Sequence, residues 1–207
     1  LMWRINFDEV IYEIKSEADE SLRQISWIDR DTFEKTSTAI KTRGFWLGTN
    51  LITALIAASV INIFKETLEE VIFLAVLMPI IASMGGVAAT QTLTITVRGL
   101  ALGQIVKANY KYIFNRELIV GITNGFLWAI VLSLIACLWF QDWTLIWVIS
   151  LSMIINLLAG ILSGMGIPIL LRSLKMDPAV AGSVIVTTVT DVVGFFSFLG
   201  FASYFYS

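Results

Sequence analysis

One acidic residue stands in the middle of a long apolar stretch. Asp191, in the sequence TTVTDVVG, is the only charged residue between Pro178 and the C-terminus. A carboxylate at the centre of a bilayer costs about 2.5–3.5 kcal/mol on insertion scales. A fixed partner would have to be a Lys or Arg in another long apolar segment, and the sequence has none there. Asp191 is therefore either protonated or paired with a mobile cation in a wet cavity.

The helical neighbours of Asp191 favour the mobile cation. If the stretch is a helix, Thr187 and Thr188 lie one turn before Asp191. Ser183 lies two turns before it and Gly194 lies nearly one turn after it, so the stripe is small and hydroxylated. A cation site is the main interpretation. A proton-coupling carboxylate and a hydrogen-bonded structural aspartate remain as alternatives.

A single carboxylate cannot enclose a divalent ion, but a homodimer could bring two copies of Asp191 together. Mg²⁺ keeps several of its waters and is commonly held through only one or two carboxylates. Two Asp191 side chains in a wet pore therefore suit a largely hydrated Mg²⁺, with Mn²⁺ and other divalent cations as further candidates. The membrane potential supplies about 4.6 kcal/mol per 100 mV for two inward charges, twice the single-charge value. Passive transport would need no chemical fuel.

The composition indicates a membrane protein and excludes several other classes. Hydrophobic residues make up 57% of the 207 residues and charged residues 14%, whereas a soluble domain carries about 25% charge. The chain has no histidine and one cysteine, so a Ser–His triad is impossible and a zinc site is difficult to build. We expect no enzyme, and nothing resembles a basic nucleic-acid-binding surface.

Five apolar segments are long enough to cross a bilayer, which takes about 20 residues in a helix. We therefore predict an all-α membrane protein with five transmembrane helices in the inner or plasma membrane of the cell. Residues 1–43 hold most of the charge and are predicted to form a cytoplasmic segment before a transmembrane domain, residues 44–207. Read from charge to charge, the predicted spans are residues 44–64, 71–97, 118–141, 143–171 and 178–206.

The connections between these spans alternate in charge. An excess of Lys and Arg marks the cytoplasmic side of a membrane, so the sequence predicts a cytoplasmic N-terminus and an extracytoplasmic C-terminus. The connections 65–70 and 141–143 are acidic or nearly uncharged. The basic connections carry Lys35, Lys41 and Arg43, then Arg98, Lys107, Lys111 and Arg116, then Arg172 and Lys175.

Two spans contain residues that interrupt helices. In the second span, Pro79 precedes Gly85 and Gly86, which predicts a bend or an unwound turn. Polar residues including Gln91 follow, as expected where irregular backbone is buried in protein or lines water. In the fourth span, glycines at 160 and 164 permit close helix contact. For that span, tight packing and a functional bend stay open as alternatives.

Two long motifs resemble those of the MgtE family of magnesium channels. Residues 77–105, LMPIIASMGGVAATQTLTITVRGLALGQI, resemble the second-span signature of the family, and residues 177–196, DPAVAGSVIVTTVTDVVGFF, resemble the fifth-span signature. The resemblance implies a homodimer with five helices per subunit, a pore on the dimer axis and Asp191 as the main ion-binding carboxylate. It implies pore-lining or ion-hydrating roles for Ser183, Thr187, Thr188, Gly85, Gly86 and Gln91.

The N-terminal segment adds to the resemblance, and one position departs from it. Residues 7–26 resemble the end of the family's last CBS domain and the start of its amphipathic connecting, or plug, helix. In the family that helix closes the pore when cytosolic Mg²⁺ binds acidic residues there. The resemblance implies this regulatory role for Glu17, Asp19 and Glu20, although each taken singly fits a solvated face better. Val87 stands where the family commonly has Asn, which could hydrogen-bond the water shell of a pore ion.

The sequence therefore predicts a passive channel or transporter for Mg²⁺, with a second copy of the chain, membrane lipid and the cation as its partners. The alternative is a proton- or sodium-coupled secondary transporter in which Asp191 is the coupling carboxylate. Broken helices also occur in such transporters, but five spans do not divide into matched halves and no inverted repeat is visible. An intramembrane enzyme, which would need a second carboxylate, and a non-conducting scaffold subunit are further alternatives.

Overall fold

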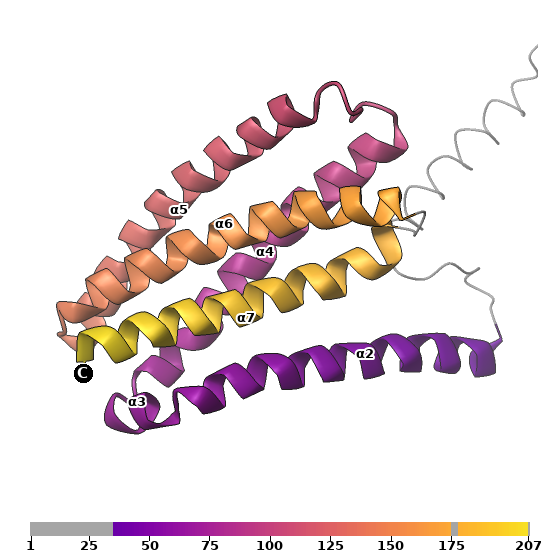
Figure 1. The fold of residues 1–207 in the computed structure, drawn as a ribbon. Helices are drawn as coiled ribbons and strands as arrows, with labels where there is room; N and C mark the ends of the chain where they lie inside the picture. Colours follow the sequence, from indigo (N-terminus) through magenta and orange to yellow (C-terminus); the bar gives the residue numbers. More distant parts are fainter. Residues whose placement is uncertain (1–34, 175–177, 207) are drawn as a thin grey trace, which may run out of the picture.

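The computed structural model describes residues 35–174 and 178–206, and all regular structure in these ranges is helical (Figure 1). Five of the helices are long and apolar enough to cross a membrane, so the predicted number of spans is confirmed for the described ranges. The short helix α3 lies at the turn between the first two spans. The helices are α2 (Thr36–Ile63), α3 (Lys65–Glu70), α4 (Leu74–Ala101), α5 (Tyr110–Phe140), α6 (Thr144–Ser173) and α7 (Pro178–Tyr206).

Three helices extend by four residues or more beyond the apolar segments that predicted them. α2 begins at Thr36 instead of residue 44, α5 begins at Tyr110 instead of residue 118, and α4 ends at Ala101 instead of residue 97. A helix bonds its own backbone whatever the polarity of its side chains, so it can continue through charged residues at the membrane surface. The predicted plug-like segment, with Glu17, Asp19 and Glu20, lies outside the described residues.

The second span has no unwound turn. α4 is helical without interruption from Leu74 to Ala101, with Pro79 inside it, so of the two expected possibilities, a bend or an unwound turn, the unwound turn was wrong. Pro79 lies in the second turn, where its missing N–H deprives only the Ala75 carbonyl of its helical partner. The helix start already uses shorter i to i+3 bonds, such as that from Leu74 N to Val71 O at 3.1 Å. A proline placed so early therefore leaves the helix continuous.

Helix α6 occupies the centre of the bundle and packs against α4, α5 and α7 (Figure 1). A Cβ atom at Gly160 would lie 2.8 Å from Gly85 O, and one at Gly164 would lie 2.5 Å from Ala89 O. The backbones of α4 and α6 are thus in direct contact, and α6 is helical through both glycines. Of the two alternatives left open for these glycines, the structure supports tight packing.

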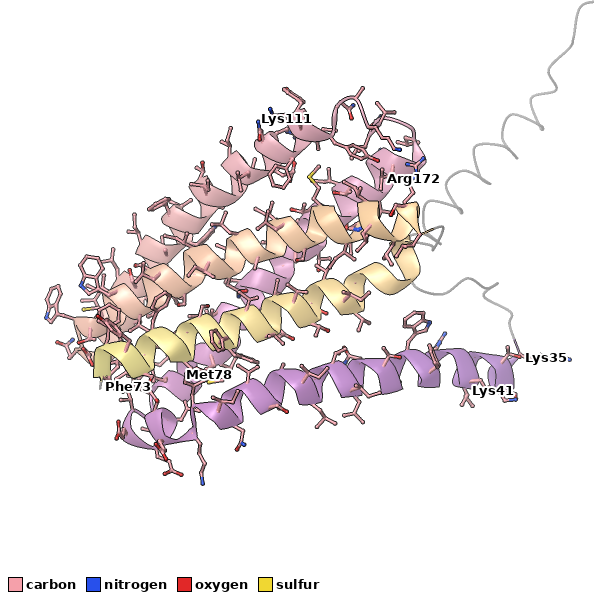
Figure 2. The ribbon with its side chains drawn as sticks, viewed as in Figure 1. Lys35, Lys41, Phe73, Met78, Lys111 and Arg172 are labelled. Atoms are coloured by element: carbon pink, nitrogen blue, oxygen red, sulfur yellow. The ribbon has the colours of Figure 1, made fainter. Side chains whose placement is uncertain are left out.

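The basic side chains gather toward one end of the bundle. Lys35 and Lys41 at the start of α2, Lys111 at the start of α5 and Arg172 near the end of α6 lie toward the same end, away from Phe73 (Figure 2). The acidic helix α3, with the sequence KETLEE, lies at the other end. The alternation of charge along the sequence therefore becomes a difference between the two ends of the folded molecule.

Candidate ion site

Asp191 lies near the middle of α7, at the edge of the face that packs into the bundle. Its neighbours Thr190 and Gly194 are buried, whereas Asp191 is half-buried. Its carboxylate makes no ion pair or hydrogen bond with any residue in the described ranges. An acidic group in this position is stabilised only by protonation, by water or by a cation from outside the chain.

Four hydroxyl-bearing residues precede Asp191 on α7, and three of them, Ser183, Thr187 and Thr188, were predicted as part of the site. Thr187 Oγ1 donates to Ser183 O at 2.9 Å, and Thr188 Oγ1 donates to Val184 O at 2.6 Å. Each threonine thereby uses its proton within its own helix, which leaves oxygen lone pairs free to accept hydrogen bonds from water. Ser183 and both threonines are half-buried. They form a surface of acceptors beside the carboxylate.

Helix α4 meets α7 at the level of Asp191. A Cβ atom at Gly86 would lie 4.0 Å from the hydroxyl oxygen of Thr190, the residue next to Asp191. The same stripe of α4 continues with Thr90, whose hydroxyl donates to Gly86 O at 2.8 Å, and Thr94, whose hydroxyl donates to Thr90 O at 2.8 Å. Thr90 is exposed and Thr94 is half-buried. The seam between α4 and α7 therefore carries hydroxyl groups from both helices.

The other predicted residues of α4 lie elsewhere. Gly85 faces α6, because the place of its missing Cβ is taken by the side chain of Asn156. Gln91 is exposed and shares the outward face of α4 with Val87, which is 52% exposed. Within one chain, Gly86 is brought to the level of Asp191, while Gly85 and Gln91 face other directions.

Asn156 of α6 is absent from the predicted set and lies close to this site. It is fully buried, and its Nδ2 donates to Ile81 O of α4 at 2.7 Å. A carboxamide within a long apolar segment is a signal that could have identified it, since small and polar residues mark helix contacts in membranes. It belongs to a buried stripe of residues spaced by four: Ser152, Asn156, Gly160 and Gly164.

The chain alone provides a sparse set of metal ligands. No group of three or more His, Cys, Asp or Glu side chains that could hold a metal ion occurs among the residues described. A cation at Asp191 would have one carboxylate from this chain, with hydroxyl, carbonyl or water oxygens as its other ligands. An all-oxygen set of this kind suits hard cations such as Mg²⁺ and Ca²⁺ rather than metals that prefer thiolate.

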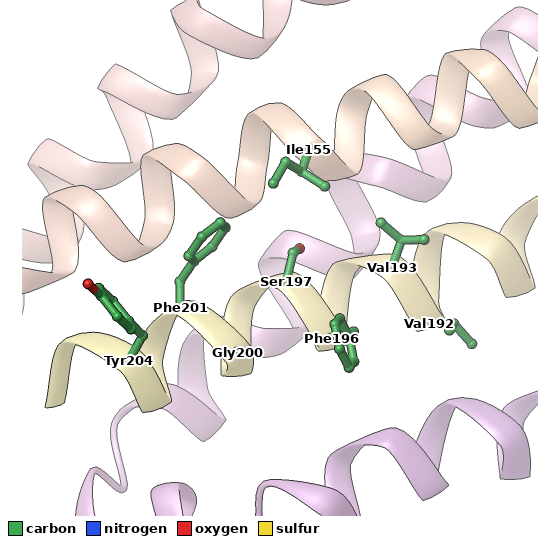
Figure 3. A pocket seen from close by; sticks show the side chains of 8 residues that line it. All are labelled: Ile155, Val192, Val193, Phe196, Ser197, Gly200, Phe201 and Tyr204. Atoms are coloured by element: carbon green, nitrogen blue, oxygen red, sulfur yellow. The ribbon is translucent and has the colours of Figure 1, made fainter. Parts of the chain in front are cut away.

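An apolar hollow of about 660 Å³ lies along the C-terminal half of α7 (Figure 3). None of its lining side chains is charged, and the hydroxyl of Ser197 donates to Gly194 O at 3.2 Å. The hollow is chemically suited to apolar groups and not to a bare cation. Its lining residues are Ile155, Val192, Val193, Phe196, Ser197, Gly200, Phe201 and Tyr204.

Five helices long and apolar enough to cross a membrane, found in the described ranges, define a multi-pass membrane protein. Residues 78–201 match the family model MgtE, described as a divalent cation transporter, and the chain belongs to this family. The resemblance seen in the two motifs is thereby confirmed.

Three relatives, each named magnesium transporter MgtE, are similar over nearly the whole chain. The protein from Bacillus subtilis is 31% identical over 203 residues, which cover 97% of this chain and 45% of the relative. The Enterococcus faecalis protein is 28% identical over 206 residues, which cover 99% of this chain and 46% of the relative. The Thermus thermophilus protein is 27% identical over 202 residues, which cover 96% of this chain and 45% of the relative. The chain spans less than half the length of these relatives.

Proposed function

We propose that the chain forms the membrane-spanning part of a passive divalent-cation channel, with Mg²⁺ as its leading ion. Two copies would place their Asp191 side chains around a pore on the shared axis. The observation that carries the proposal is the half-buried Asp191 carboxylate, which has no cationic partner in the described ranges and lies beside a seam of hydroxyl groups. Membership of a divalent cation transporter family and relatives named magnesium transporters support the same assignment.

The chemistry of the seam favours an ion that keeps its water shell. Waters bound to Mg²⁺ donate hydrogen bonds outward, and the hydroxyl oxygens of Thr187 and Thr188 have lone pairs free to accept them. Two carboxylates would balance the two charges of the ion. We assign the same water-facing role to Ser183 and Gly86, and to Gln91 on the outward face of α4, where a partner subunit could reach it. Gly85 contributes indirectly, by allowing α6 to approach α4.

The membrane orientation and the regulatory segment are further parts of the proposal. The basic end of the bundle would face the cytoplasm, because Lys and Arg are enriched on that side of membrane proteins. This orientation puts the N-terminus inside and the C-terminus outside. Residues 1–43 would form the cytoplasmic segment, and Glu17, Asp19 and Glu20 would bind cytosolic Mg²⁺ there.

Reconstitution of the full 207-residue chain in liposomes tests the proposal. We expect Mg²⁺ uptake that increases with an inward-negative voltage and does not change when a pH or Na⁺ gradient is collapsed. Asp191→Asn should reduce uptake at least about tenfold, the equivalent of ~1.4 kcal/mol. Asp142→Asn is the matched control, because Asp142 lies in the connection between α5 and α6.

Two results would count against the proposal. Wild-type uptake by Asp191→Asn would remove this carboxylate from the ion path. Uptake that stops when the proton or sodium gradient is collapsed would instead establish the coupled-transporter alternative.

A further inference from the structure

The side chain of Asn156 is enclosed between two glycines from different helices. A Cβ atom at Gly194 of α7 would lie 2.8 Å from Asn156 Nδ2 and 3.2 Å from Asn156 Oδ1. A Cβ atom at Gly85 of α4 would overlap the same carboxamide, at 2.6 Å from Oδ1. The carboxamide from α6 therefore fills the space that two side chains would otherwise occupy, and it contacts both of the helices that form the seam, α4 and α7.

The orientation of this carboxamide is fixed by one hydrogen bond. Only the NH₂ group can donate to Ile81 O, at 2.7 Å. Oδ1 is consequently directed elsewhere, and it is buried without any hydrogen-bond partner among the described residues. An unpaired buried acceptor costs about 1–3 kcal/mol. A leucine of similar size would fill the space without that cost. We therefore infer that Asn156 Oδ1 has a hydrogen-bond partner that does not belong to the chain.

The unpaired oxygen lies close to the candidate ion site. Gly194 follows Asp191 by three residues, and positions three apart on a helix have Cβ atoms about 5–6 Å from each other. On α4, Gly85 is adjacent to Gly86, which faces Thr190 beside Asp191. Asn156 Oδ1 thus packs against α7 at Gly194, one helical turn along the backbone from Asp191.

We propose that Asn156 is a positioning residue for the ion site at Asp191, an inference that rests on the proposed function. Its carboxamide sets the separation of α4 and α7, and its Oδ1 accepts a hydrogen bond from an ordered water that also contacts the water shell of the cation. Buried waters make about three hydrogen bonds to polar groups that are otherwise unpaired. Loss of the carboxamide therefore changes how the hydrated ion is held more than it changes folding.

The test compares Asn156→Leu with Asn124→Leu in the full chain. Asn124 is a matched control, because it is exposed on α5 and its Nδ2 donates to Val120 O of its own helix at 3.0 Å. Uptake of Mg²⁺ and of Mn²⁺ into liposomes is measured together with thermal unfolding of the metal-free protein. Loss of a group that supports a metal ligand typically costs 10–100-fold in metal affinity or activity, so we expect Asn156→Leu to lower Mg²⁺ uptake about tenfold and to change the Mg²⁺/Mn²⁺ ratio. Asn124→Leu should match the wild type in both.

Each outcome bears on the inference in a defined way. If Asn156→Leu keeps the wild-type uptake and ion ratio while Asp191→Asn loses uptake, the inference is overturned and the proposed function stands. If Asp191→Asn keeps wild-type uptake, both are overturned. A changed ion ratio with an unchanged melting temperature supports the inference, because a purely structural residue would not alter selectivity.

A second variant covers the case in which Asn156→Leu fails to fold. Asn156→Asp keeps the shape of the side chain and replaces the amide with a second carboxyl group near the ion. Such a group should retain Mg²⁺ more strongly, so uptake should reach half-saturation at a lower Mg²⁺ concentration. An unchanged half-saturation concentration together with an unchanged ion ratio overturns the inference.

Discussion

Helices α2 and α6 look alike in sequence and differ in their place in the fold. They contain 28 and 30 residues, and each has two glycines four apart, Gly44 and Gly48 in α2 and Gly160 and Gly164 in α6. Yet half of the most apolar window of α6 is buried, compared with 6% of that of α2. Cβ atoms at the two glycines of α6 would strike α4, whereas at the two glycines of α2 they would meet no described atom within 4 Å.

This difference shows that neither apolarity nor glycine spacing alone determines helix packing. Lipid tails are as apolar as leucine, so helices in membranes associate through close packing and polar contacts. α6 has both, since its buried face carries Ser152, Asn156 and Ser163 in addition to its glycines. Hydrogen bonds also link both of its ends to other helices. Arg172 donates to Leu100 O of α4, and Asp142, just before α6, accepts from Tyr206 of α7. A glycine pair permits a contact, and the residues around it determine whether the contact forms.

The largest effect should come from filling the contact between α4 and α6. Gly164→Leu must displace Ala89 O, 2.5 Å from the new Cβ, and should destabilise the protein by about 3 kcal/mol. Gly48→Leu should change stability by less than about 0.5 kcal/mol. Equilibrium unfolding in mixed detergent micelles measures both. Equal losses for the two variants would show that α2 and α6 are packed to the same degree.

A smaller effect should follow from releasing the C-terminal end of α6. Arg172 Nη1 donates to Leu100 O near the end of α4 at 2.9 Å. Hydrogen bonds to charged groups contribute about 1.5–3 kcal/mol, and since Arg172 is exposed we expect a loss near the lower end for Arg172→Leu. Arg116→Leu is the control, because Arg116 is an exposed arginine on α5. The same unfolding titration measures the free energy of unfolding of both variants. Equal values would mean that the bond between Arg172 and Leu100 O does not contribute to stability.

The smallest effect concerns the N-terminal end of α6 and depends on pH. Asp142 accepts hydrogen bonds from Tyr206 Oη at 2.6 Å and from Thr144 N at 2.8 Å. Burial raises the pKa of Asp142, but these hydrogen bonds outweigh it and hold the pKa below the ordinary value of 3.8. The resulting stabilisation is complete above that ordinary value and is lost as the pH falls through the lower folded-state pKa.

Tyr206→Phe should remove most of this acid dependence. We expect it to cost about 1 kcal/mol at neutral pH and less once the pH falls below the lowered pKa of Asp142, where the wild-type carboxylate also loses its charge. Thermal unfolding across a pH series measures the difference. Tyr204→Phe is the control, because Tyr204 is 78% exposed on the same helix. If the stability difference between wild type and Tyr206→Phe is the same at all pH values, the hydrogen bond between Tyr206 and Asp142 is not the source of the acid dependence.

The parts of the fold that were predictable depend on local patterns. The number of spans follows from the lengths of the apolar segments, whereas the glycine spacing of α6 permits a close contact without determining that it forms. The helix bounds were predicted less well, because α2 and α5 continue into polar residues that the lipid does not require to be apolar. The unwound turn at Pro79 was wrong, since a proline near the start of a helix removes only one hydrogen bond.

The candidate site was likewise predictable only where its residues lie on one helix. Ser183, Thr187, Thr188 and Asp191 share one helix, so their common stripe follows from helical periodicity, and their role in ion binding stays a prediction. The position of Asn156 depends on contacts among α4, α6 and α7, which are far apart in sequence. No spacing within a single segment shows that an amide on one helix fits between glycines on two others.

The enclosed carboxamide of Asn156 occupies the space that side chains at positions 85 and 194 would need, so the sizes of these three residues depend on one another. Residues 85, 156 and 194 share a single small compartment, so a methyl group gained at 85 or 194 must be matched by a shorter side chain at 156. Across related chains these positions should therefore change in concert, and an engineer who alters one of them must alter another in the same step.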